Sequence, residues 1–320
     1  MSTYDFVGVD VAKDKIDVAF EKDGHFKHNV FSNNSKGHKE FFEWLNRHTS
    51  LPWVCMEATG HYSIGIADFL TEHSIRVSVI NPFQVKNFAK ASLARNKNDL
   101  IDSKIITQFG QRMRPRIYQS TPAEQKEIKD LTKLLDMLKA QLIQLTNQLH
   151  STQGTIARKA LEKMSQNFEK EIAQLEKEIA NLIARNEQLN EQFRLLTSIK
   201  GIGKLTAFRV IALMPHINSF STAKQFAAYI GITPKSHQSG YFVGKTTISR
   251  LGDGRLRKSL YMAALVAKNY NKALANFVSR LQMKGKTPKT IICAVMRKLA
   301  HIIFGVLKSK QPFNENFACL

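Results

Sequence analysis

The stretch YDFVGVDVA, residues 4–12, decides the fold of the first third of the chain. Its mostly apolar run predicts a buried strand, and the acid Asp10 lies near the end of that run. A buried, unpaired carboxylate is costly unless it is neutralised or bound to a cation. The stretch therefore predicts both a strand and a candidate ion-binding position.

The segments that follow alternate between strand and helix signals. Further strands are predicted in KIDVAF (15–20), KHNVFSN (27–33), PWVCMEA (52–58) and IRVSVINP (75–82), and helices in SKGHKEFFEWLNRH (35–48) and YSIGIADFLTEH (62–73). This order predicts an α/β domain, residues 1–120, with a mixed sheet and helices on its faces.

The middle of the chain carries two heptad series. Leucines 131 to 149 are spaced alternately by four and three, and after HSTQGT (150–155) a second such series runs from Phe168 to Leu196. This pattern predicts a coiled-coil hairpin or one half of an intermolecular bundle over residues 121–196, with Asn186 on its apolar seam. As a function for it, a spacer is favoured over a recognition surface.

Residues 197–320 read as short helices and turns, a mainly α domain that holds nearly all of the net charge. The chain has a formal charge of +21 and a pI of about 9.9. From residue 195 onward the sequence holds 20 Lys and Arg but only two acidic residues, Asp253 and Glu315. Such segregation favours a nucleic-acid partner, because phosphate contacts release counterions. An anionic membrane is a weaker alternative, since no long basic amphipathic helix accounts for the charge.

The remaining bulk signals favour a reducing cytosol. Cys55, Cys293 and Cys319 are odd in number, far apart and form no metal-ligand pattern. No signal peptide and no apolar run long enough for a bilayer are expected.

Four acids stand out as a set. Asp10 and Glu57 each end a predicted buried strand, whereas Asp99 and Asp102 lie one helical turn apart in ARNKNDLIDSK, residues 94–104. If they converge at one sheet edge, they can hold two divalent cations about 4 Å apart. Oxygen ligands alone favour Mg²⁺ or Mn²⁺. Asp14, Asp17 and Asp68 are interpreted as ordinary solvated charges.

Several motifs carry a family resemblance. VGVDVAKDKIDVAF, EATGHY, INPFQVKNFAKA and KNDLIDS resemble the RuvC-like (RNase H fold) domain of the DEDD-type insertion-sequence transposases, relatives of the Piv DNA invertases. LLTSIKGIGKLTAFRVIA, FAAYIGITPKSHQSG and ISRLGDGRLRKSLYMAA resemble the transposase domain of the same family. Asp10, Glu57, Asp99 and Asp102 fall on the D-E-D-D positions. The last acid is followed by Ser103, where the family more often has alanine.

The resemblance implies a nucleophile and an assembly. Ser239, in the Ser-Gly dipeptide of GITPKSHQSG, is the implied attacking residue, with Ser236 as second choice and His237 as a possible base. It further implies donor and target duplex DNA, a structured guide (bridge) RNA, and dimers that pair into a tetramer.

Candidate nucleic-acid contacts come from basic residues and glycine turns. The turn at Gly201 and Gly203 resembles a helix-hairpin-helix element, whose N–H groups hold a phosphate, although a plain interhelical turn remains an alternative. The full set is Lys97, Lys104, Lys200, Gly201, Gly203, Lys204, Lys235, Lys245, Arg250, Arg255, Arg257 and Lys258.

Together these features predict a transposase or recombinase that cuts and rejoins DNA with metal ions and a serine. Two rivals remain open: a RuvC-like nuclease in which water attacks, and an architectural DNA-binding protein without catalysis.

Overall fold

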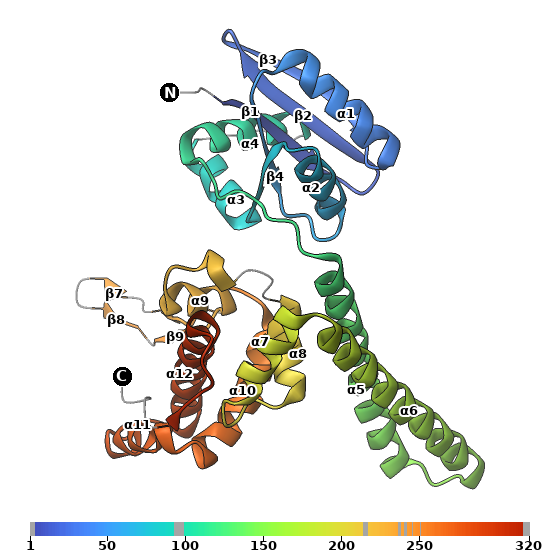
Figure 1. Ribbon diagram of the computed structural model, residues 1–320, viewed down its shortest axis with the longest axis vertical. Helices are drawn as coiled ribbons and strands as arrows, with labels where there is room; N and C mark the ends of the chain where they lie inside the picture. Colours follow the sequence, from blue (N-terminus) through green and yellow to red (C-terminus); the bar gives the residue numbers. More distant parts are fainter. Residues whose placement is uncertain are drawn as a thin grey trace. The chain divides into compact units, whose positions relative to one another are not determined.

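The structure is a computed structural model of the 320-residue chain, and it describes residues 4–92, 99–213, 217–235, 238–239, 242–244, 246–249 and 251–315. The chain divides into two compact units, residues 1–120 and residues 121–320 (Figure 1). The helical hairpin belongs to the second unit, and a further boundary at residue 196 stays a prediction.

The first unit contains a five-stranded mixed sheet in the order β3-β2-β1-β4-β5. Antiparallel strands β1, β2 and β3 form a meander, and β4 and β5 continue the sheet parallel to β1. The strand bounds are β1 Asp5–Val11, β2 Lys15–Lys22, β3 His25–Ser32, β4 Pro52–Glu57 and β5 Arg76–Ile80. The predicted α/β class is confirmed for this unit.

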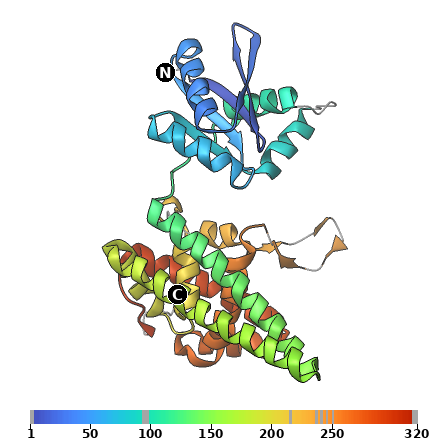
Figure 2. The ribbon, with the colours of Figure 1, turned by 90° about the vertical axis from the view of Figure 1, so that its right-hand side faces the viewer.

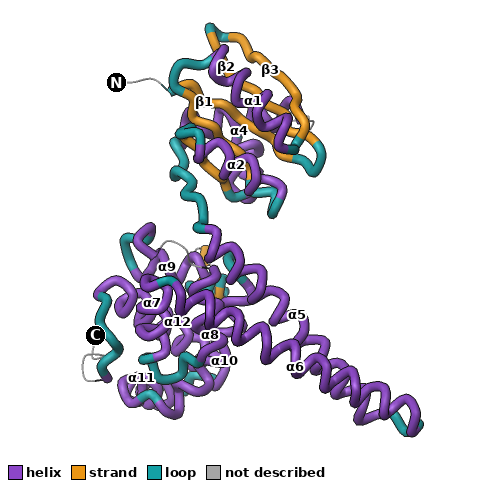
Figure 3. Tube along the Cα trace, turned by 45° about the vertical axis from the view of Figure 1, so that its right-hand side comes forward, coloured by secondary structure: helices purple, strands orange, loops and turns teal. Residues whose placement is uncertain are grey.

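Helices cover both faces of that sheet because its central strands are apolar on both sides. Val7, Val9 and Val11 of β1 face one cluster with α1 Ser35–His48 and α2 Tyr62–Glu72. Phe6 on the opposite face joins a cluster with α3 Pro82–Ala91 and α4 Asp99–Met113. Figure 3 shows the sheet in orange between these helices.

The second unit begins with a hairpin of two long helices. Helix α5, Ala123–Ser151, packs along α6, Thr155–Arg185, as Figure 2 shows in green. Only the base of the hairpin enters the core, through Ile128, Leu135, Ile179 and Ile183. A helical hairpin is therefore observed, whereas its coiled-coil character stays a prediction.

The rest of the second unit is helical, with two small two-stranded sheets. Its remaining elements are α7 Glu187–Thr197, α8 Lys204–Leu213, η1 Ile217–Ser219, α9 Ala223–Ile230, β6 Pro234–Lys235, β7 Gln238–Ser239, β8 Phe242–Val243, β9 Thr247–Ile248, α10 Gly254–Tyr270, α11 Lys272–Met283 and α12 Pro288–Ser309. The core forms around α12, which contacts α7, α9, α10 and α11.

By length and composition, helix α12 alone among the described helices could span a membrane, although Arg297 and Lys298 interrupt its apolar residues. Half of its most apolar window is buried inside the unit, and nine of its residues belong to the core. The burial of these side chains accounts for its apolar composition.

One detail of the hairpin prediction is wrong. Asn186 does not lie on a continuous apolar seam, because α6 ends at Arg185 and Asn186 begins α7. Its side chain accepts a hydrogen bond from the N–H of Leu189 and donates one to Glu124. An amide at this position serves as a helix N-cap, which is a common role of asparagine.

Candidate active site

Strand pairing brings two of the predicted acids to one edge of the sheet. Strands β1 and β4 are parallel, with Val9 opposite Met56, so Asp10 and Glu57 follow as neighbours at their carboxyl ends. Side chains alternate along a strand, which places Asp10 on the same face as Gly8. That face is covered by α4, the helix that begins with the other two acids.

Helix α4 approaches the sheet closely because Gly8 has no side chain. A Cβ atom at Gly8 would lie 2.1 Å from the carbonyl oxygen of Ser103 and 2.5 Å from the amide nitrogen of Thr107. The N–H of Gly8 donates to Thr107 Oγ1 at 3.0 Å, and that hydroxyl donates to the carbonyl of Ala19 at 2.8 Å. This buried contact fixes the first turn of α4, which carries Asp99 and Asp102, beside the end of β1.

The crowding of these acids is visible in the pKa of Asp10. Burial is the largest cause that raises this pKa from 3.8 to about 6, and the charges of Asp102, Asp99, Glu57 and Asp17 contribute the rest in that order of size. The four acids of the predicted set therefore interact electrostatically. The fifth carboxylate, Asp17, is the cross-strand partner of Asp10 on β2.

Lys15 is the cation that the structure places among these acids. Its Nζ lies 2.6 Å from Asp99 Oδ2 and 3.1 Å from Asp17 Oδ2. Hydrogen bonds to these two carboxylates raise the pKa of Lys15 above its usual range.

The interpretation of Asp17 as a solvated charge was wrong. Its side chain is 7% exposed and also lies 3.3 Å from His28 Nε2. Asp68 likewise is buried and accepts hydrogen bonds from the hydroxyls of Tyr118 and Ser120. Both acids are held by partners that only the folded chain supplies.

The four acids are of the chemical type that binds a divalent cation, but their side chains are not yet spaced as a metal site. Carboxylate oxygens are the ligands that Mg²⁺ and Mn²⁺ favour, and a cation would relieve the repulsion that raises the pKa of Asp10. Over the described residues, however, no three His, Cys, Asp or Glu side chains already form a metal-ligand group. The carboxylate oxygens are thus suitable ligands for the ion, and Lys15 contacts one of the four acids, Asp99.

The predicted nucleophile lies in the second unit. Ser239 belongs to β7, where it pairs with Phe242 of β8. The described part of the chain includes the backbone of Ser239 but not its side chain, and Ser236 and His237 lie outside it. Its role stays a prediction.

The candidate nucleic-acid residues have different surroundings. Lys204, Lys235, Arg255 and Lys258 are exposed, whereas Lys200 forms an ion pair with Glu315 and Arg257 donates to the carbonyl of Ile230. In the first unit, Lys104 lies over the ring of Phe26. Lys97, Lys245 and Arg250 lie outside the described residues.

The turn between α7 and α8 packs tightly at its first glycine. Gly201 has a positive φ of 104°, and a Cβ there would lie 2.7 Å from the Cβ of Ala267 on α10. This close approach explains Gly201 without a ligand, whereas Gly203 has open space around it. The helix-hairpin-helix function stays a prediction.

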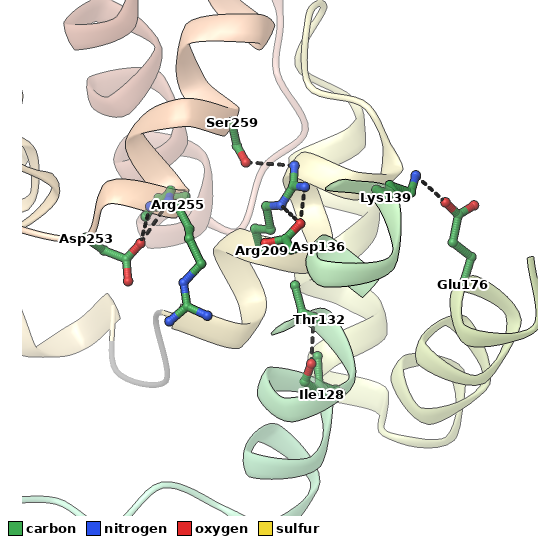
Figure 4. Close-up of polar contacts among 10 residues, drawn as sticks. Ile128, Thr132, Asp136, Lys139, Glu176, Arg209, Asp253, Arg255 and Ser259 are labelled. Atoms are coloured by element: carbon green, nitrogen blue, oxygen red, sulfur yellow. Dashed lines mark hydrogen bonds and ion pairs between the residues drawn. The ribbon is translucent and has the colours of Figure 1, made fainter. Parts of the chain in front are cut away.

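A polar cluster that the sequence did not indicate joins the hairpin to the core. The guanidinium of Arg209 on α8 donates to Asp136 on α5 and to the hydroxyl of Ser259 on α10 (Figure 4). Close by, Asp253 accepts hydrogen bonds from the N–H groups of Arg255 and Leu256 at the start of α10. Three helices that are distant in sequence are thereby held together at the hairpin base.

Two family profiles match the chain. The first, described as a transposase, covers residues 7–154 and thus the acid cluster. The second, described as a transposase of the IS116/IS110/IS902 family, covers residues 193–279.

Full-length relatives agree with these profiles. The pilin gene-inverting protein of Moraxella bovis is 31% identical over 315 residues, which cover 97% of this chain and 98% of the relative. The transposase for insertion sequence element IS1328 of Yersinia enterocolitica is 26% identical over 302 residues, 82% of this chain and 85% of the relative.

Among solved structures, T. thermophilus RuvC in complex with a Holliday junction substrate superposes with a TM-score of 0.28 and 16% identity, covering 35% of this chain and 96% of that one. That superposition is too weak to define a fold, and the α/β class follows from the strand order alone.

The matches place the chain in the class of transposases and related DNA-inverting proteins. It belongs to the IS116/IS110/IS902 family, and the predicted family resemblance is confirmed.

Proposed function

We propose that this protein cleaves and rejoins DNA strands, either to move an insertion sequence or to invert a DNA segment. The observation that carries the proposal is the close packing of α4 on β1 at Gly8, with Glu57 following at the end of the neighbouring strand β4. The raised pKa of Asp10, to which the charges of the other three acids contribute, supports it. Acids from two strands and one helix then form a single site, within an α/β unit that we assign to the RuvC-like class.

The four acids would hold Mg²⁺ or Mn²⁺, with two ions as the expected number. When bound, such ions polarise a phosphodiester and stabilise the charge that develops on it. The residues of this chain supply the rest: Gly8 and Thr107 hold α4 in place, so that Asp99 and Asp102 stay beside Asp10.

Ser239 is the proposed nucleophile. Its hydroxyl oxygen would form a bond to phosphorus while the bond from phosphorus to a DNA sugar oxygen breaks, and the serine proton would pass through solvent to that sugar oxygen, which leaves as a hydroxyl group. The phosphoserine ester keeps the phosphodiester linkage, so a strand can be rejoined without ATP.

The partners follow from charge and family. Donor and target duplexes would bind the basic third of the chain, where the counterion effect is strongest. A structured guide RNA and a dimer that pairs into a tetramer rest on the family resemblance alone. Sequencing of nucleic acid that co-purifies with the protein tests the RNA directly.

A two-variant cleavage experiment separates this proposal from its rivals. Asp99→Ala should abolish strand cleavage and largely retain DNA binding, and Ser239→Ala should abolish the covalent protein–DNA species. Ser236→Ala tests the second-choice nucleophile in the same loop. Cleavage retained by both serine variants would favour water as nucleophile. Absence of cleavage by the wild type, with DNA binding unchanged in Asp99→Ala, would favour an architectural role.

A further inference from the structure

Lys15 contacts the acid cluster in a way that the proposed mechanism does not require. It is the first residue of β2, and its side chain is 47% exposed while its Nζ contacts both Asp99 and Asp17. The contact with Asp99 joins residues 84 positions apart. It therefore depends on the folded arrangement of β2 and α4.

The geometry places this ammonium group among prospective ligands. Lys15 and Asp17 are two residues apart on β2, and Asp17 lies opposite Asp10 on β1. All three therefore face the α4 side of the sheet. The ammonium group offsets part of the negative charge that accumulates there.

A divalent cation and the ammonium group compete for the same oxygen atom. Mg²⁺ binds carboxylate oxygens at about 2.0–2.1 Å. An ammonium nitrogen 2.6 Å from Asp99 Oδ2 would then lie within a few ångströms of the ion, where two positive charges repel each other strongly. Ion binding at Asp99 therefore requires the release of Lys15.

We propose that Lys15 is a resident counter-cation that holds Asp99 until a divalent cation binds and that limits the affinity of the site for that cation. Asp17 is the residue that retains Lys15 after its release, because Asp17 is buried and its Oδ2 lies 3.1 Å from Lys15 Nζ. This inference rests on the proposed function, in which Asp99 is a metal ligand.

The test uses full-length protein, with Mn²⁺ as the probe. Lys15→Met keeps the length of the side chain and removes its charge. Lys13→Met is the matched control, since Lys13 is exposed two residues away and forms no ion pair among the described residues. Calorimetric titration gives the dissociation constant for Mn²⁺, and thermal unfolding in EDTA gives the stability of the metal-free protein.

We expect opposite changes in the two measurements. Lys15→Met should bind Mn²⁺ about tenfold more tightly, since a competing positive charge is gone. The same variant should unfold at a lower temperature in EDTA, because the repulsion among the acids is no longer offset. Lys13→Met should match the wild type in both, and Lys15→Arg should keep wild-type Mn²⁺ affinity.

The contrary outcomes are distinct. Unchanged or weaker Mn²⁺ binding by folded Lys15→Met, with circular dichroism as the check of folding, overturns the role of Lys15. If Lys15→Met does not fold, tighter Mn²⁺ binding by Lys15→Gln supports the inference, and unchanged affinity overturns it. If wild-type protein binds no Mn²⁺ and cleaves DNA in EDTA, the metal-dependent function itself fails.

Discussion

Asp10 is a residue whose proposed chemical role opposes the stability of the fold. Its folded-state pKa of about 6 exceeds the ordinary value of 3.8, so folding takes up a proton between these two values. Stability contributed by the protonated carboxyl is present below about pH 4 and is lost as the pH rises through about 6. Above pH 7 the charged form is a constant cost to stability, which Lys15 offsets in part and a bound divalent cation would relieve further.

Asp10→Asn should therefore raise the unfolding temperature of metal-free protein at pH 7.5, although it removes a proposed ligand. The advantage over wild type should shrink as the pH is lowered from 7 toward 4, because the wild-type carboxyl becomes neutral. Thermal unfolding in EDTA at several pH values measures this. Asp14→Asn, in the exposed turn after β1, is the control.

A destabilised Asp10→Asn variant at pH 7.5, or an advantage that does not depend on pH, would contradict the interpretation of Asp10 as a charge held against repulsion.

Single residues differed in how well the sequence revealed them. The positions of Asp10 and Glu57 could be predicted, because each lies at or next to the carboxyl end of an apolar strand, where a carboxylate is unusual. Lys15 and Asp17 were not, because their partners lie on other elements and no local pattern encodes a contact across 84 residues. Ser239 was indicated by resemblance alone.

At the scale of elements, the packing of α4 on β1 decides where two of the four acids lie. Gly8→Ala would insert a methyl group where backbone atoms of Ser103 and Thr107 leave no space. We expect a loss of about 3 kcal/mol or more in the free energy of unfolding. We also expect weaker Mn²⁺ binding, since α4 must shift.

Gly65→Ala on α2 is the matched control for that change. A Cβ at Gly65 meets only His38, at 3.7 Å, so stability should be equal or slightly higher. Urea unfolding of both variants measures the difference. Similar stability for the two variants would show that α4 tolerates a displacement from β1.

The strands of the first unit and its helices α1 and α2 could be predicted from local patterns, whereas helix α3 and the close approach of α4 to β1 were not predicted. Glycine in a strand indicates a close neighbour without saying which element supplies it. The cluster of Arg209, Asp136 and Ser259 could not be predicted either, because each of these residues belongs to a separate helix and no local pattern shows which helices meet.

The attachment of the hairpin base gives a second test at this scale. Arg209→Met would leave Asp136, whose side chain is 22% exposed, without its guanidinium partner. We expect a loss of about 2 kcal/mol in the free energy of unfolding, less than for a fully buried pair. Urea denaturation measures it, with Arg158→Met as control, because the exposed pair with Glu162 should contribute below about 0.5 kcal/mol.

At the scale of the whole molecule, the concentration of positive charge after residue 195 predicts how DNA binding depends on salt. The logarithm of the binding constant should fall linearly with the logarithm of salt concentration, by about 0.9 per phosphate contact. Replacing both exposed residues Arg255 and Lys258 with Gln should reduce this slope by about 1.8 in fluorescence-anisotropy titrations of duplex DNA.

The exposed lysines Lys159 and Lys163 of α6 provide the comparison, and their double Gln variant should keep the wild-type slope. Equal slopes for all three proteins would remove Arg255 and Lys258 from the DNA interface.

The position of α12 in the chain has a consequence during synthesis. This helix begins at Pro288, yet it forms the centre against which α7, α9, α10 and α11 pack. A ribosome that has made the chain as far as Thr287 has already exposed a complete α/β unit but cannot yet have completed the helical one. An interrupted translation product would therefore carry the acids without a folded partner unit, so the fold itself would withhold the proposed strand cleavage and rejoining from unfinished chains.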